Sequence, residues 1–92
     1  MVLEIVTPEA SIFNSEVTSV AVPGVHGDFQ MLSNHAAIVS LLDKGTIRIK
    51  GDAIKIEKEF ISKFNQENEE YQLTINSGTI EMNANKIIIL AD

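Results

Sequence analysis

The sequence lacks cysteine and tryptophan, and it contains only two prolines, four phenylalanines and one tyrosine. Without cysteine, the chain forms no disulfide bond, no thiolate metal site and no cysteine nucleophile. No apolar run approaches the roughly 20 residues that a membrane-spanning helix needs, so direct membrane insertion is not expected. The first fifteen residues carry Glu4 and Glu9 and no Lys or Arg, so no signal peptide is expected either.

Basic residues are also scarce, since seven Lys and Arg stand against thirteen Asp and Glu, for a formal net charge of −6. Nearly all of that charge lies in residues 1–43, which contain no Lys or Arg. Nucleic-acid binding needs a basic surface, so a nucleic-acid partner is not expected. Two explanations of the uneven charge remain open: solubility, or a negative face that meets a basic partner.

The spacing of apolar residues indicates a β protein. Ninety-two residues, 45% of them hydrophobic, suffice for one domain with a packed core. The dominant spacing is two, which is the period of a strand with one buried face. It recurs, with turn residues between the segments, over residues 46–50, 54–57, 72–76 and 79–83. This pattern predicts a small antiparallel β-sandwich or barrel.

The N-terminal half is strand-like but less regular. A β-branched run over 2–6 predicts a first strand, and the change of parity within 12–22 predicts a β-bulge near residues 17–20. Residues 25–28 are expected to form a loop tip, with a short return strand after it. The apolar segment Ile38–Leu42 is expected to be a strand that is buried on both faces.

One segment departs from the period of two. Phe60, Ile61 and Phe64 have the spacing i, i+1 and i+4, which predicts a short helical turn near residues 58–65. An acidic loop over 66–70 is expected to follow. Extended pairing of this segment is the alternative.

Few residues carry the pattern of a catalytic site. His26 and Asp28 could bring an imidazole and a carboxylate together as half of a metal site, but no second cluster completes it. Ser33, His35 and Asp28 are the residue types of a catalytic triad, but no nucleophile-elbow motif accompanies them. No P-loop is present, so nucleotide binding is not expected. The sequence therefore predicts no catalytic residue, no metal and no cofactor, and a protein that works by contact.

Several short segments occur in an informative order. They are Leu3-Glu4-Ile5-Val6-Thr7-Pro8-Glu9, Val20-Ala21-Val22-Pro23-Gly24, Asn34-His35-Ala36-Ala37-Ile38, Lys44-Gly45-Thr46-Ile47-Arg48-Ile49, Gly78-Thr79-Ile80-Glu81-Met82 and Ile87-Ile88-Ile89-Leu90-Ala91-Asp92. Together they resemble the epsilon subunit of F-type ATP synthases, called delta in mitochondria. The resemblance covers residues 1–50 and 71–92. Residues 52–70 are longer than the family's usual hairpin. The two C-terminal helices with which the family commonly continues are absent, so their inhibitory and ATP-binding roles are not expected.

The resemblance implies a single domain over residues 1–92, folded as an all-β, ten-stranded antiparallel β-sandwich. It implies a non-catalytic rotor subunit of the central stalk, which links the gamma subunit to the polar loops of the membrane c-ring and couples proton transport to ATP synthesis. The expected location is peripheral, on the cytoplasmic face of the bacterial inner membrane.

The resemblance also supplies candidate contact residues. Asp28 and His26 are the candidates for the c-ring, and Thr7, His35 and Ser40 are the candidates for the gamma subunit. The alternative function is a stand-alone acidic β-sandwich module that binds a carbohydrate or a peptide. Such a module needs an exposed aromatic platform or an open edge strand.

Overall fold

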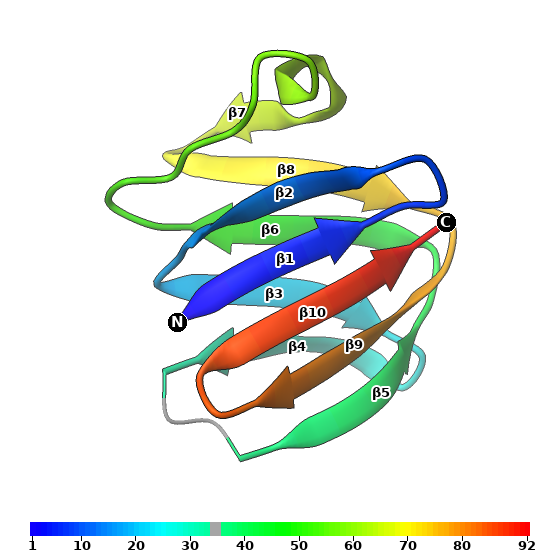
Figure 1. Ribbon diagram of the computed structural model, residues 1–92. Helices are drawn as coiled ribbons and strands as arrows, with labels where there is room; N and C mark the ends of the chain where they lie inside the picture. Colours follow the sequence, from blue (N-terminus) through cyan, green and yellow to red (C-terminus); the bar gives the residue numbers. More distant parts are fainter. Residues whose placement is uncertain (34–35) are drawn as a thin grey trace.

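The structure, a computed structural model that describes residues 1–33 and 36–92, consists almost entirely of strands (Figure 1). They are β1 Val2–Val6, β2 Ser11–Glu16, β3 Ser19–Gly24, β4 Gly27–Leu32, β5 Ile38–Leu42, β6 Gly45–Lys50, β7 Asn65–Glu67, β8 Glu70–Ile75, β9 Gly78–Asn83 and β10 Lys86–Ala91.

The strands form two layers. One layer has the order β2-β1-β10-β9-β5, and the other contains β4-β3-β6-β8-β7. A single residue pair, Gly24 with Leu42, joins β3 to β5, so the two layers are one sheet that curls back on itself. The predicted all-β, ten-stranded sandwich is confirmed. Its pairing is antiparallel except between β1 and β10, which run parallel.

The core lies between the two layers. Successive side chains of a strand point to opposite faces, so every second residue enters the core. Leu3 and Ile5 of β1, and Ile47 and Ile49 of β6, are completely buried in this way. Removing each such side chain from water contributes roughly 1.5–3 kcal/mol. The period-two predictions for 46–50, 72–76 and 79–83 are therefore confirmed as strands with one buried face.

The prediction that Ile38–Leu42 is buried on both faces was wrong. This segment is strand β5, but Val39 and Leu41 are 77% and 61% exposed. Ile38, Ser40 and Leu42 occupy the less exposed side. The physical reason is that the domain has only two layers, so nothing in the described chain covers the outward side of β5.

The predicted bulge near residues 17–20 was also wrong. Val17 and Thr18 form a corner where the chain leaves β2 in one layer and enters β3 in the other. The amide of Val17 donates to the carbonyl of Met1 (2.9 Å), and that of Thr18 donates to the carbonyl of Lys50 (2.7 Å). The parity of the apolar residues therefore changes because the chain changes layers.

A β-bulge does occur, within β2. Ile5 pairs with Phe13 and the next residue, Val6, pairs with Ser11, which leaves Ile12 as the extra residue. As a result Ile12 and Phe13, although adjacent, are both buried.

The predicted helical turn near 58–65 is present as a short 3₁₀ helix, Ile61–Lys63. Phe64, directly after it, is buried, and its ring centroid lies 5.7 Å from that of Phe13 in β2. The described part of the chain contains no helix with the length and hydropathy needed to cross a bilayer.

Two neighbouring predictions were wrong. Residues 54–57 are not a strand; Ile54 and Ile56 instead pack against the core from an irregular segment. Residues 66–70 are not a loop, because β7 pairs with β8 through a tight turn at Asn68 and Glu69. Packing of Ile54 and Ile56 against the core accounts for the first difference, and backbone pairing of β7 with β8 accounts for the second.

We expect Ala84→Gly to stabilise the domain. Ala84 and Asn85 connect β9 to β10 with φ angles of 49° and 69°, a left-handed conformation that strains side chains other than glycine. Glycine relieves this strain but also increases the entropy of the unfolded chain, which partly offsets the gain. The net free energy of unfolding, measured by urea denaturation, should rise by about 0.5–1 kcal/mol. Ala53→Gly, at an exposed position without a positive φ, is the control and should give no gain. Equal changes in both variants would contradict this explanation.

Candidate functional site

The turn between β3 and β4 forms a narrow tip. Gly24 pairs with Gly27, and Val25-His26 closes the hairpin. A Cβ atom on Gly24 would lie 2.7 Å from the Gly27 carbonyl oxygen and 2.7 Å from the ring of Phe29. Gly27 has a φ of +118°, which favours glycine. The two glycines therefore allow the chain to reverse within this short turn.

His26 and Asp28, the candidates for the c-ring, are both exposed at this tip. The described residues form no hydrogen bond or ion pair with either side chain. Arg48 lines the same shallow hollow as Asp28 but lies too far away for an ion pair. In the described chain no group of three metal-ligating side chains is present. The Asp28 carboxylate is thus available to a basic partner.

The gamma-subunit candidates have different surroundings. Thr7 is half-buried in the turn after β1, where its backbone amide donates to the carbonyl of Ala10 (2.8 Å) and its hydroxyl donates to the same oxygen (3.2 Å). Ser40 lies on the side of β5 that also carries the buried Leu42. His35 falls outside the described residues. Thr7 thus lies just beyond β1 and Ser40 lies on β5. These two strands flank β10 and β9 in one layer.

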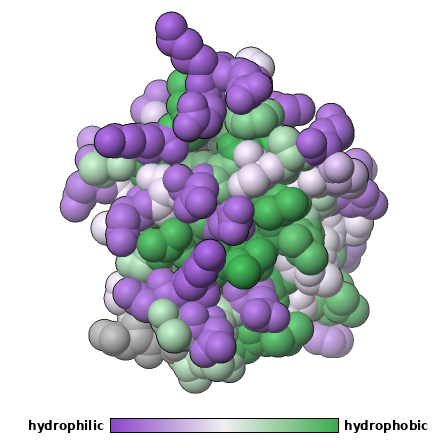
Figure 2. Space-filling model, viewed as in Figure 1, coloured by the Kyte–Doolittle hydropathy of each residue, from purple (hydrophilic) through white to green (hydrophobic). Residues whose placement is uncertain are grey.

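Between these strands lies a surface that the sequence did not predict, here called the outer face. It consists of the outward side chains of four adjacent strands. The pairing places Leu41, Thr79, Leu90 and Val6 in one row across the layer, and Val39, Glu81, Ile88 and Glu4 in the next. Figure 2 shows the apolar side chains gathered over β10 and its neighbours, with hydrophilic side chains between them.

The composition of the outer face is unusual for an exposed surface. The outward side of an antiparallel sheet is ordinarily polar, whereas Val39, Leu41 and Leu90 are 77%, 61% and 53% exposed. A groove of about 510 Å³ continues from Leu41 and Leu90 to Val25 at the β3–β4 tip. Large apolar side chains that gather on one exposed face mark interaction sites. In the sequence, the outer face is indicated by the apolar segment 38–42, which we had assigned to the core.

Comparison with protein families gives a match over residues 1–92 to the model described as ATP synthase, Delta/Epsilon chain, beta-sandwich domain. Among curated proteins, the ATP synthase epsilon chain of Campylobacter concisus is 40% identical over 90 residues, which is 98% of this chain and 59% of the relative. The epsilon chain of Sulfurovum sp. is 38% identical over 92 residues, which is 100% of this chain and 61% of the relative. The chain thus spans about three fifths of the length of these relatives.

Two solved structures share the fold. A chain from the central stalk and c-ring of the Tetrahymena thermophila mitochondrial ATP synthase has a TM-score of 0.73 at 13% identity, over 99% of this chain and 62% of that one. A chain from the Euglena gracilis mitochondrial ATP synthase has a TM-score of 0.77 at 17% identity, over 99% of this chain and 49% of that one.

The outer face should be dispensable for folding. We expect the double variant Val39→Thr, Leu41→Thr to unfold within about 0.5 kcal/mol of the parent, because both side chains are exposed and threonine suits a strand. The control, Ile80→Thr, changes a buried residue of the adjacent strand and should cost about 2 kcal/mol or more. Urea denaturation measures both. Similar losses in the two proteins would show that Val39 and Leu41 support the core rather than a contact surface.

Proposed function

Because this chain belongs to the ATP synthase delta/epsilon beta-sandwich family, we propose that it is a non-catalytic subunit of the central stalk. In this role it links the gamma subunit to the c-ring and couples proton transport to ATP synthesis, on the cytoplasmic face of the bacterial inner membrane. The observation that carries the proposal is the apolar outer face, which a protein that acts by contact requires.

The outer face is our assignment for the gamma subunit. It offers aliphatic side chains from β5, β10 and β1, with the polar Thr79 and Glu81 of β9 between them, and aliphatic side chains stabilise a complex by leaving water. Thr7 follows Val6 of this face directly, Ser40 lies between Val39 and Leu41 but on the opposite side of β5, and His35 precedes β5 in the sequence. We propose that these three residues border the contact, while Val39, Leu41 and Leu90 supply most of its buried area.

The β3–β4 tip is our assignment for the c-ring. Asp28 is exposed there and forms no ion pair with the described residues, and residues 1–43 contain no Lys or Arg. A carboxylate on a narrow tip attracts a basic, polar loop, such as the family's c-ring presents. His26, beside it, offers a hydrogen-bonding ring to the same loop.

The alternative, a stand-alone module for a carbohydrate or peptide, needs an exposed aromatic platform or an open edge strand, and the aromatic residues test the first of these. Phe13 and Phe64 are buried, and Phe29, Phe60 and Tyr71 are partly buried against the core. The aromatic residues therefore favour the central-stalk proposal over this alternative.

Co-expression with the gamma subunit from the same source tests the proposal directly. We expect a stoichiometric complex to co-purify at moderate salt, because an aliphatic contact is insensitive to ionic strength. A variant with Leu41→Asp, which introduces a charge into the outer face, should abolish the complex while the domain stays folded. Failure of the parent protein to co-purify would overturn the proposal.

Asp28→Lys should weaken coupling without unfolding the domain, because it reverses the charge at an exposed tip. The measurement is ATP-driven proton pumping in membranes that carry the variant, where we expect a several-fold loss. Glu59→Lys, an equal charge change at an exposed position between β6 and β7, is the control and should pump normally. Undiminished pumping with Asp28→Lys would remove Asp28 from the contact.

A further inference from the structure

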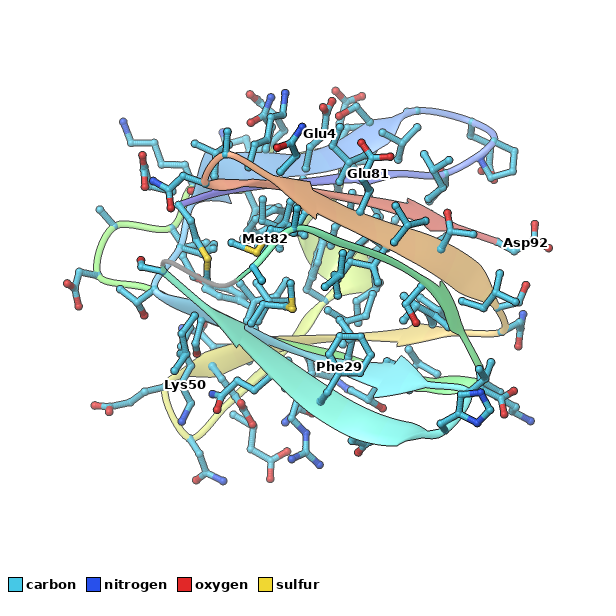
Figure 3. The ribbon with its side chains drawn as sticks, turned by 90° about the horizontal axis from the view of Figure 1, so that it is seen from below. Glu4, Phe29, Lys50, Glu81, Met82 and Asp92 are labelled. Carbon is cyan, nitrogen blue, oxygen red and sulfur yellow. The ribbon has the colours of Figure 1, made fainter. Side chains whose placement is uncertain are left out.

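Glu81 stands among aliphatic side chains on the outer face. It lies on β9, directly between Val39 of β5 and Ile88 of β10. Glu81 belongs to the segment Gly78–Met82, one of those that resemble the epsilon subunit family. The function proposed above assigns no contact to this residue. Figure 3 shows Glu81 and Glu4 projecting from the same side of their layer, while Met82 points between the layers.

The charges on this face do not balance. Glu4 is satisfied, since its carboxylate lies 3.8 Å from Nζ of Lys86 and accepts a hydrogen bond of 2.9 Å from the hydroxyl of Ser11. Glu81 is exposed, and the described residues provide it with neither an ion pair nor a hydrogen bond. Lys86 is therefore committed to Glu4, and the carboxylate of Glu81 relies on water.

Covering this face removes that water. A carboxylate that loses its hydration among aliphatic groups is strongly destabilised unless a cation or hydrogen-bond donors replace the water. Glu81 and Val39 line a hollow of about 400 Å³, which is large enough to admit a long side chain. The partner's side chain that enters it must therefore donate hydrogen bonds to Glu81, and a cationic donor compensates the buried carboxylate best.

We propose that Glu81 determines specificity at the outer face by pairing with an arginine or lysine side chain of the protein that covers it. This inference rests on the proposed function, which makes that protein the gamma subunit. An arginine suits the site best, because its planar group binds a carboxylate through two parallel hydrogen bonds while its flat surface packs against Val39 and Ile88. The aliphatic residues thus supply the buried area, and Glu81 selects the partner and its register.

The experiment measures the affinity of the complete chain for the purified gamma subunit by titration calorimetry. We expect Glu81→Gln to weaken binding tenfold or more, because it leaves the partner's cation buried without a counter-charge. Glu81→Lys should weaken binding further, through repulsion. Glu59→Gln is the matched control: it removes an exposed, unpaired carboxylate outside the outer face and should bind like the parent. Unchanged thermal unfolding will show that each variant is folded.

The outcomes separate this inference from the proposed function. If Glu81→Gln binds as tightly as the parent or more tightly, while Val39→Thr, Leu41→Thr binds more weakly, the outer face is the contact but no cation faces Glu81, and the inference is overturned. If the parent protein does not bind the gamma subunit, the proposed function and this inference fail together. Weakening by Glu81→Gln with the control unaffected supports the inference.

Discussion

The parallel pairing of β1 with β10 joins the first strand of the chain to the last, and the rest of the sandwich depends on it. Through it the β1–β2 hairpin attaches to β10, β9 and β5, so one layer is complete only when both ends of the sequence are in place. The pairing sets Leu3 and Ile5 beside Ile87 and Ile89 in the core. The same register also sets Val6 beside Leu90 on the opposite side. One ladder thus aligns both the core and the outer face.

The fold was largely predictable from the sequence, whereas the outer face was not. Alternation of apolar and polar residues over 46–50 and 79–83 indicates a strand with one buried side. That prediction does not depend on where the strand lies in the tertiary structure. An apolar segment such as 38–42 carries no such information, since a strand between two layers and a strand with an uncovered apolar side have the same composition. The difference depends on how many layers the domain has. Only the topology shows that the described residues form no third layer above β5.

The candidate contact residues illustrate the same limit. The tip at residues 25–28 was predictable because glycine marks a tight reversal, and Asp28 is exposed there as a tip residue should be. Glu81 gave no comparable signal. A glutamate between isoleucine and methionine in an alternating strand is what any exposed strand position offers. Its significance arises from Val39 and Ile88, which flank it from strands distant in sequence.

The segment between β6 and β7 also limits pairing between edge strands of different copies of the chain. β2 is the outermost strand of its layer, and such strands invite pairing with other copies of the chain. Here the amide of Lys55 donates to the hydroxyl of Ser15, and Phe64 packs on Phe13, so the segment lies against β2. The outermost strand of the other layer, β7, is short and fully exposed and ends in Glu67. The segment therefore covers part of β2 and leaves only a short, polar strand at the other edge, which limits edge-to-edge pairing between copies of a domain that also exposes Val39, Leu41 and Leu90.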